Sequence, residues 1–320
     1  MDYIFIIAWF ALLIKWADYM VEWASSLAKT FWVSNLVIWL TVIAFWTSAP
    51  ELVTSMMSAF DWSADLAISN VIGSNISNLL LILWTTALIF PLKAPTNTFY
   101  KEMPFMLASC ILFLLLVLYE PEKTITRPDA FILIMFFCIF LYYIFRQATK
   151  KATPTKQSST WDKESITLLP KWKSYTYTIG GLIWLVLGWK LIVDWAVWIA
   201  ESFKIPNAFI WVTIVAIWTS LPELASSIAA ALKKNTDMAI GWIIGSNIFN
   251  SLWILWATGI FLPLQAYEWV AIDAYFNIFV VILVMLFVYI WKNKYTIGKF
   301  EWSILLSLYF SYIWYLIYSL

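Results

Sequence analysis

Two acidic side chains in apolar surroundings are the residues of this sequence best suited to chemistry. Glu51 lies in FWTSAPELVTS, and Glu223 lies in the similar segment IWTSLPELASS. Carboxylates inside membrane segments are costly, and they usually serve a function there. Two negative charges match one divalent cation, and Ca²⁺ takes about six to eight oxygen ligands. Because the chain has no histidine, the sequence predicts a site for hard cations rather than for zinc, copper or haem.

Hydroxyl side chains and a backbone carbonyl accompany the first glutamate. In a helix, Thr47 and Ser48 share one face with Glu51, because residues three or four apart are neighbours. Pro50 has no N–H, so the carbonyl of residue 46 loses its usual helical partner. A carbonyl freed at membrane depth is tolerated only where it faces protein or a water-filled cavity. The motif therefore gathers a carboxylate, two hydroxyls and a carbonyl at one depth.

A second polar group follows on the next apolar segment. Gly73 is expected to break that helix, and Ser74 and Asn78 lie four residues apart on one face. Any one of these residues could serve packing alone, since Ser and Thr bond back to their own backbone and Asn joins neighbouring membrane helices. The duplication of the whole set favours a binding site.

Both polar groups recur at one fixed distance along the chain. A shift of 172 residues places Glu51 on Glu223, and it places the GSNI that begins at Gly73 on the GSNI that begins at Gly245. Each copy is predicted to hold five spans, an odd number, so the second copy enters the bilayer from the opposite side. Inverted repeats of this kind are typical of secondary transporters.

The composition is that of a polytopic membrane protein. Hydrophobic residues make up 63% of the 320 residues and charged residues 12%, whereas soluble domains have about 45–50% and about 25%. We predict an all-α polytopic membrane protein with ten transmembrane helices in two inverted-topology five-helix repeats. The repeats are placed at 1–146 and 174–320, joined by a basic linker at 147–173. The spans are expected at roughly 3–25, 33–59, 64–91, 103–119, 128–146, 176–199, 205–232, 237–262, 272–290 and 302–319.

Charges in the connections alternate in sign along the chain. Lysine and arginine gather in every second connection and in the 147–173 linker, while acidic residues dominate the others. By the positive-inside rule the linker is cytoplasmic and both termini lie outside. We expect no cleavable signal peptide, and we expect a multi-pass protein of the cell (cytoplasmic) membrane.

The segments WTS-x-PE and GSNI-x-N of this chain resemble the motifs GTS-x-PE and GSNI-x-N of the calcium:cation antiporter superfamily, the sodium/calcium exchangers and their prokaryotic relatives. The resemblance covers the whole chain, with the two signature alpha-repeats at about 41–80 and 213–252. It implies exchange of Na⁺ for Ca²⁺ by alternating access, driven by the sodium gradient. The ten candidate ligands that it implies are Glu51, Glu223, Thr47, Thr219, Ser48, Ser220, Ser74, Ser246, Asn78 and Asn250.

The resemblance also limits the chemistry to be expected. Ca²⁺ and Na⁺ are the transported ions, H⁺ and K⁺ stay open as further coupling ions, and no cofactor or enzyme activity is expected. The bilayer is the expected partner, without nucleic acid or an obligate protein partner. A Ca²⁺/H⁺ antiporter, a cation channel and a transport-impaired scaffold are the alternatives to Na⁺/Ca²⁺ exchange.

Tryptophan is unusually frequent in this chain, with 23 residues against 8 glycines. Trp46 and Trp218 occupy the position of the glycine in the family motif, and Trp9 falls opposite Gly181 when the two halves are aligned. We hypothesise that many tryptophans occupy glycine positions. Glycine lets membrane helices approach closely, so such replacements would impair packing and transport.

Overall fold

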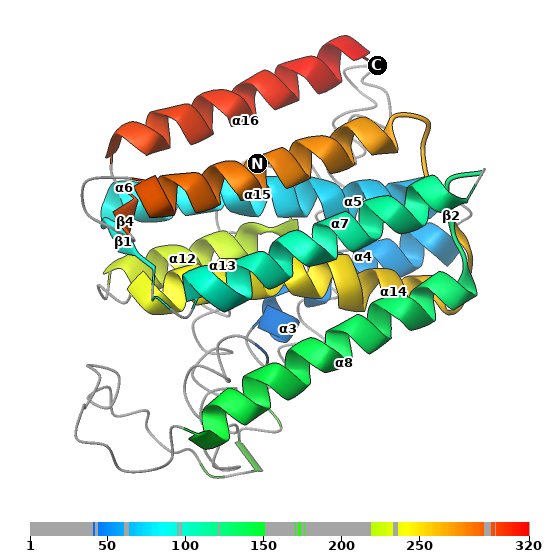
Figure 1. The fold of residues 1–320 in the computed structure, drawn as a ribbon, viewed down its shortest axis with the longest axis horizontal. Helices are drawn as coiled ribbons and strands as arrows, with labels where there is room; N and C mark the ends of the chain where they lie inside the picture. The colour runs from blue at the N-terminus through cyan, green and yellow to red at the C-terminus, as the bar shows by residue number, and fades with distance from the viewer. Residues whose placement is uncertain are drawn as a thin grey trace, which may run out of the picture.

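A computed structural model describes the central helices of both halves (Figure 1). The predicted span at 3–25, nearly all of the predicted span at 176–199 and most of the linker lie outside the described residues, and so do parts of the predicted spans at 33–59 and 205–232. The charged residues of the first two of these spans therefore lie outside as well: Lys15, Asp18, Glu22, Lys190 and Asp194. The described residues are 41, 44–60, 64–94, 96, 98–120, 122–150, 170, 172–173, 176, 219–232, 236–290, 296–297 and 299–319.

Helices dominate the described part of the chain, and four two-residue strands are its only extended elements. The first half contains α3 (Ala44–Thr47), α4 (Ala49–Phe60), α5 (Ala64–Ser77), the π-helix η2 (Asn78–Ile82), α6 (Leu83–Ile89), the π-helix η3 (Thr98–Glu102), α7 (Met103–Tyr119) and α8 (Arg127–Lys150). The second half contains α12 (Leu221–Leu232), α13 (Thr236–Ile248), the π-helix η6 (Phe249–Ile254), α14 (Leu255–Gly259), α15 (Val270–Ile290) and α16 (Lys299–Ser319). The strands are β1 (Leu92–Lys93), β2 (Thr124–Ile125), β3 (Leu264–Gln265) and β4 (Thr296–Ile297).

Five helical segments in the described residues are long and apolar enough to cross a bilayer. They agree with five predicted spans, and Ser303–Tyr318 adds a shorter apolar stretch where a further span was predicted. The protein is therefore a mostly helical, multi-pass membrane protein. The five segments are Ala64–Ile89, Thr98–Tyr119, Arg127–Arg146, Ala239–Gly259 and Val270–Tyr289.

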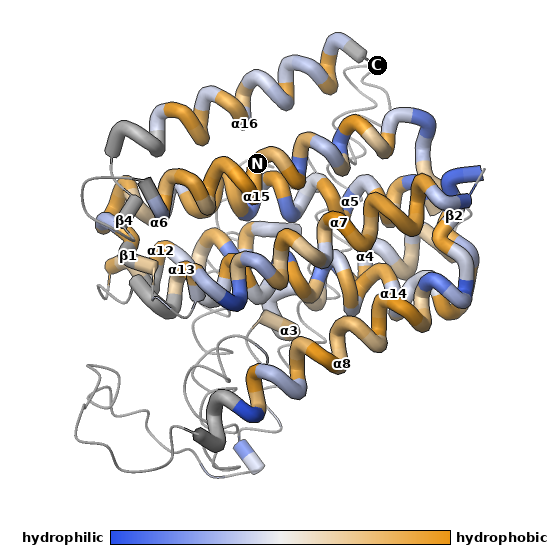
Figure 2. The backbone as a smooth tube through the Cα atoms, viewed as in Figure 1, coloured by the Kyte–Doolittle hydropathy of each residue, from blue (hydrophilic) through white to orange (hydrophobic). Residues whose placement is uncertain are grey.

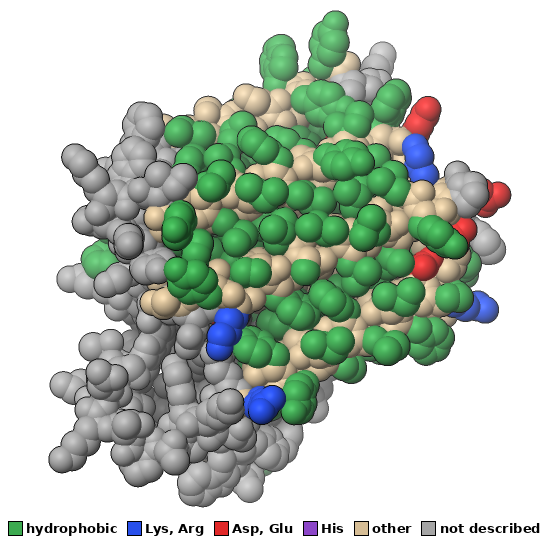
Figure 3. All heavy atoms as spheres, viewed as in Figure 1, with side chains coloured by type: hydrophobic (Ala, Val, Ile, Leu, Met, Phe, Trp, Pro, Cys, Tyr) green, Lys and Arg blue, Asp and Glu red, His purple; other side chains and the backbone are tan. Residues whose placement is uncertain are grey.

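Burial separates two inner segments from three outer ones. Ala64–Ile89 and Ala239–Gly259 are mostly enclosed by protein, whereas the other three expose much of their surface. The exposed surface is apolar: large side chains such as Leu115, Met135 and Phe279 stand outward. Figures 2 and 3 show hydrophobic residues across the middle of the bundle and charged residues near its two ends. Such a surface suits lipid, and the enclosed helices carry the polar motifs.

Two strand pairs connect the halves, and the sequence did not predict them. β1 pairs with β4, with Leu92 opposite Ile297, and β3 pairs with β2, with Leu264 opposite Ile125. A shift of 172 residues converts one register into the other. The strand pairs lie at opposite ends of the bundle in Figure 1. The internal repeat therefore extends well beyond the polar motifs, through the connections on both sides of α7 and α15.

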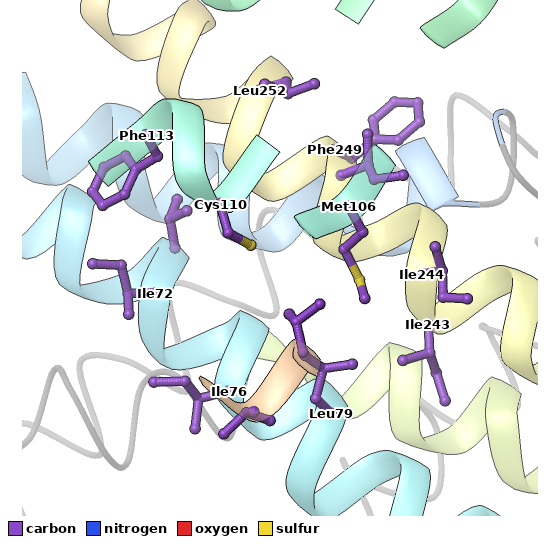
Figure 4. Packing of buried hydrophobic residues seen from close by; sticks show 14 of the residues in the cluster. Ile72, Ile76, Leu79, Met106, Cys110, Phe113, Ile243, Ile244, Phe249 and Leu252 are labelled. Atoms are coloured by element: carbon purple, nitrogen blue, oxygen red, sulfur yellow. The ribbon is translucent and has the colours of Figure 1, made fainter. Parts of the chain in front are cut away.

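The apolar core lies between α5, α7 and the α13–η6 segment. Met106 and Cys110 of α7 stand between Ile76 on one side and Ile244 and Phe249 on the other (Figure 4). Between membrane helices, van der Waals packing of such side chains stabilises the association, because lipid is as apolar as the core. This packing holds α5 against η6, so the polar faces of the two halves are fixed side by side.

The expected helix break at Gly73 is wrong. Gly73 lies inside α5, and no glycine among the described residues has a positive φ. The irregularity comes five residues later, where α5 changes into the π-helix at Asn78, and the second half repeats this change at Phe249. Short π segments inside α-helices are rare and are frequent at functional sites.

Gly259, at the end of α14, marks a close approach between the halves. A methyl group at this position would lie 3.4 Å from Ala130 Cβ and 3.8 Å from Ile125 Cγ2 and Leu264 Cδ1. We expect Gly259→Ala to leave the free energy of unfolding within about 1 kcal/mol, because a methyl fits and alanine favours the helix. Gly259→Leu should cost about 1–3 kcal/mol or more through overpacking.

Thermal unfolding of the detergent-purified full chain measures both Gly259 variants. Equal loss of stability in Gly259→Ala and Gly259→Leu would contradict the prediction, since only the larger side chain exceeds the space.

Candidate cation-binding site

Each glutamate stands at the start of a helix that follows a short interruption. In the first half Ser48 separates α3 from α4, and Pro50 and Glu51 lie in the first turn of α4. The helical hydrogen bonds resume on both sides, from Ser48 N to Ala44 O and from Leu52 N to Ser48 O. The interruption is therefore local to the proline, which lacks a donor.

The second half repeats this geometry. Ser220 directly precedes α12, Glu223 lies in its first turn, and Leu224 N bonds to Ser220 O. Both motifs thus place a hydroxyl and a carboxylate beside a proline at a helix start. Within the first motif, the hydroxyls of Thr47 and Ser48 bond to Ala44 O and to Glu223 rather than to Glu51.

The two glutamates meet hydroxyl groups of the opposite half. Both carboxylates have 0% exposure. Ser48 Oγ donates to Glu223 Oε1 at 3.2 Å, and Ser220 Oγ donates to Glu51 Oε1 at 3.5 Å. The 172-residue shift exchanges these two serine–glutamate contacts, so they are equivalent. The two carboxylates are also close enough for their charges to interact.

The two threonines lie beside the same carboxylates. Thr219 approaches Glu51, and Thr47 approaches Glu223. Thr47 Oγ1 donates to Ala44 O at 3.3 Å, and Thr219 Oγ1 lies 3.5 Å from Ser74 Oγ. The contact to Ala44 lies within the first half, whereas the contacts to Ser74 and to the two glutamates cross between the halves, as the inverted repeat predicts for a shared site.

Several buried oxygens of the candidate ligands have no hydrogen-bond partner within the described residues. They include Oε2 of Glu51, Oε2 of Glu223, Oγ of Ser246 and Oδ1 of Asn78 and Asn250. Leaving a buried polar group unpaired costs about 1–3 kcal/mol, and more for a charged group. So many unpaired acceptors in one buried region are the arrangement expected where cations bind.

The two predicted asparagine ligands, Asn78 and Asn250, make no hydrogen bond to either glutamate within the described ranges. Asn78 Nδ2 donates to Asn247 Oδ1 at 3.4 Å. Asn250 makes no hydrogen bond in the described part of the chain: both polar atoms of its amide are buried and unpaired. Among the described residues, hydrogen bonds thus link Asn78 only to another asparagine and leave Asn250 unconnected to either glutamate.

Sequence reasoning missed residues that support the ligands. Asn70 Nδ2 donates to the Glu51 carbonyl at 3.3 Å and to Ser55 Oγ at 3.2 Å. Trp242 Nε1 donates to Thr47 Oγ1 at 3.0 Å. Asn70 and Trp242 occupy equivalent positions in the two halves, so their mismatch in the alignment was the signal that could have identified them.

Two further buried carboxylates lie outside this cluster. Tyr143 OH donates to Glu102 Oε1 at 2.8 Å, and Tyr267 OH donates to Asp273 Oδ2 at 2.6 Å. Asp273 lies in the first turn of α15 and is only 3% exposed. Tyr267 lies in the connection before α15. Burial of the Tyr267 hydroxyl and the nearby Asp273 charge raise the pKa of that hydroxyl. Each pair joins one carboxylate oxygen to a tyrosine hydroxyl, and the other oxygen is buried without a partner among the described residues.

The donor set defines what the cluster can bind. Within the described residues, no three His, Cys, Asp or Glu side chains gather in one place. The cluster instead offers two carboxylates with neutral hydroxyl and amide oxygens, a set that suits hard cations. The indole of Trp46 and the whole of Trp218 lie outside what the structure describes.

Comparison with known proteins gives a consistent result over nearly the full length. The family described as sodium/calcium exchanger protein matches residues 1–146 and 173–318. The inner membrane protein YrbG of Escherichia coli is 32% identical over 241 residues, covering 74% of this chain and 73% of the relative. The sodium/calcium exchanger MaX1 of Methanosarcina acetivorans is 28% identical over 331 residues, covering 90% of each chain.

A solved structure shares the fold. The sodium-calcium exchanger NCX_Mj, soaked with 2.5 mM Na⁺ and 10 mM Sr²⁺, superimposes with a TM-score of 0.71 at 28% sequence identity. The match covers 96% of this chain and 97% of that chain.

Proposed function

Because this chain belongs to the sodium/calcium exchanger family, we propose that the cluster around Glu51 and Glu223 is its transport site. The protein is a membrane antiporter that exchanges cations including Ca²⁺, and it is not an enzyme. At this cluster Na⁺ and Ca²⁺ bind in turn, and the ten candidate ligands supply the oxygens. The proposal extends the function of the family to named residues of this chain.

One observation carries this proposal. Glu51 and Glu223 are completely buried, each bonds a serine of the opposite half, and each has one carboxylate oxygen without a partner in the part of the chain that the structure describes. A divalent cation between them neutralises both charges and fills the unpaired oxygens. Without a cation, two buried like charges repel one another in a medium that screens poorly. The site therefore favours an occupied state, which is what an obligate exchanger requires.

Alternation is the proposed mechanism. The ligands come equally from the two halves, so a relative movement of the halves changes access to the cluster from each side. We infer two inverted units at 1–146 and 174–320 with the 147–173 linker between them. We also infer the cell membrane as location, a cytoplasmic linker and external termini, on the strength of the positive-inside rule.

Ca²⁺ uptake into proteoliposomes tests the proposed function. Vesicles loaded with Na⁺ and diluted into Na⁺-free buffer containing Ca²⁺ should accumulate Ca²⁺, and vesicles with equal Na⁺ on both sides should not. This result is expected because Na⁺ and Ca²⁺ share one site, so each outward transport of Na⁺ returns the site to the outside, where Ca²⁺ can bind. Uptake that follows a pH gradient and ignores Na⁺ would make H⁺ the coupling ion instead, and added K⁺ tests for a third ion.

Two other outcomes would contradict exchange by this chain as it stands. Flux far above transporter turnover rates would indicate a channel. In the second outcome the folded parent chain takes up no Ca²⁺, while a Trp46→Gly/Trp218→Gly double variant does. That result would support an exchanger scaffold blocked by tryptophan at glycine positions.

A further inference from the structure

The site departs from its internal symmetry at one position. Trp242 of α13 is 1% exposed, and it lies where the repeat has Asn70 in the other half. Its indole Nε1 donates to Thr47 Oγ1 at 3.0 Å. In the equivalent contact the hydrogen bond runs the other way, because Thr219 Oγ1 donates to Asn70 Oδ1 at 3.4 Å. Both bonds cross between the halves.

The direction of the bond decides how well a threonine can bind a cation. A hydroxyl group has one hydrogen and two lone pairs. Thr47 gives its hydrogen to Ala44 O and accepts the indole N–H with one lone pair. The hydrogen of Thr219 points to Asn70 instead, so that contact takes none of its lone pairs. The indole contact therefore leaves Thr47 with less capacity for a cation than it would have without that contact.

The contact between Ser74 and Thr219 does not cancel this difference. Their hydroxyl oxygens lie 3.5 Å apart, and either one can be the donor. A hydroxyl hydrogen rotates to suit its surroundings, whereas an indole can only donate and its N–H is fixed in the ring. Ser74 can turn its hydrogen away when a cation arrives, and Trp242 cannot.

We infer that Trp242 is a specificity-determining residue, which weakens Thr47 as a cation ligand and makes the two halves of the site unequal. This inference rests on the proposed transport site. The fixed N–H dipole points its positive end at an oxygen that should face the ion. The repulsion between a dipole and an ion scales with the charge of the ion, so Ca²⁺ is penalised more than Na⁺. Trp242 thus shifts the balance of the site toward Na⁺.

Trp242→Phe tests the role of the N–H while keeping an aromatic ring in the core. The variant should bind Ca²⁺ about three- to tenfold more tightly, the equivalent of one neutral hydrogen bond. Its affinity for Na⁺, measured by competition, should change less. The measurement is equilibrium Ca²⁺ binding to the detergent-purified full chain, titrated with and without Na⁺.

Trp253→Phe is the matched control. Trp253 Nε1 is buried without a partner in the described region, and its ring packs on Phe45 and Phe137. This variant also removes an indole N–H, but it removes no contact to a ligand, so its Ca²⁺ affinity should equal that of the parent. Thr47→Val combined with Trp242→Phe should bind Ca²⁺ no more tightly than Thr47→Val alone.

A second pair of variants leaves Trp242 untouched. Thr47→Val and Thr219→Val each delete one hydroxyl with little change of shape. If Trp242 has already weakened Thr47, Thr219→Val should lose at least about threefold more Ca²⁺ affinity than Thr47→Val. Equal losses, or unchanged or weaker Ca²⁺ binding by Trp242→Phe, would overturn the inference while the transport site stands. A folded parent chain that binds no Ca²⁺ would overturn the site and the inference together.

Discussion

Replacing Glu51 by glutamine is expected to weaken Ca²⁺ binding by about two to three orders of magnitude. The side chain keeps its shape and its place beside Ser220, but the site loses one of the two charges that balance a divalent ion. Removal of one partner from a buried charge pair costs about 3–5 kcal/mol, and each 1.4 kcal/mol is about a factor of ten in affinity. Glu223→Gln should lose a similar amount, because the hydrogen bonds of the two carboxylates are equivalent.

Glu102→Gln is the matched control for both variants. It removes a negative charge from a carboxylate that is also 0% exposed, in the same membrane domain. Tyr143 OH can still donate to the amide oxygen of Gln. Equilibrium Ca²⁺ binding and Na⁺-dependent uptake should therefore stay within about twofold of the parent. A loss as large as that of Glu51→Gln would mean that general membrane charge, and not this cluster, controls Ca²⁺ binding.

Asn250→Leu is expected to change binding and stability in opposite directions. Leucine has nearly the shape of asparagine, and it removes two buried polar atoms that have no partner among the described residues. Each unpaired group costs about 1–3 kcal/mol, so the ion-free variant should unfold several degrees higher. If Asn250 supplies an oxygen to the ion, Ca²⁺ binding should weaken by about tenfold or more.

Asn70→Leu provides the contrast. The Asn70 side chain accepts from Thr219 and donates to the Glu51 carbonyl and to Ser55 Oγ. Its removal leaves these groups unpaired, so the ion-free protein should lose about 2 kcal/mol or more of stability. Thermal unfolding with and without Ca²⁺ separates the two variants. Destabilised Asn250→Leu protein with normal Ca²⁺ binding would assign Asn250 to packing.

Much of the architecture follows from two patterns in the sequence. Long apolar segments located five helices that the structure describes, and the 172-residue shift related the polar motifs of the two halves. These patterns are strong because bilayer thickness sets helix length and because duplicated motifs fold alike. All ten candidate ligands are buried, as the motif spacing and the family resemblance implied.

Other features depend on contacts that no local pattern encodes. Gly73 looked like a helix break, but it lies inside α5, which packs against η6. The strand pairs form between segments far apart in sequence, and two-residue strands have no periodicity to detect. Ser48 shares a helix face with Glu51 by spacing, yet its hydroxyl bonds Glu223, because the partner comes from the other half.

The positions of the strands in the sequence also determine the order in which the two strand pairs form during synthesis of the chain. About 140 residues separate Ile125 from its partner Leu264, and about 200 separate Leu92 from Ile297. At a synthesis rate of roughly 5–20 residues per second, β2 waits roughly 7–28 s for its partner and β1 waits roughly 10–40 s. The end of the bundle at β2 is therefore closed first during biosynthesis. The first half must persist in the membrane with both strands unpaired until Leu264 has been made, and with β1 unpaired until Ile297 has been made.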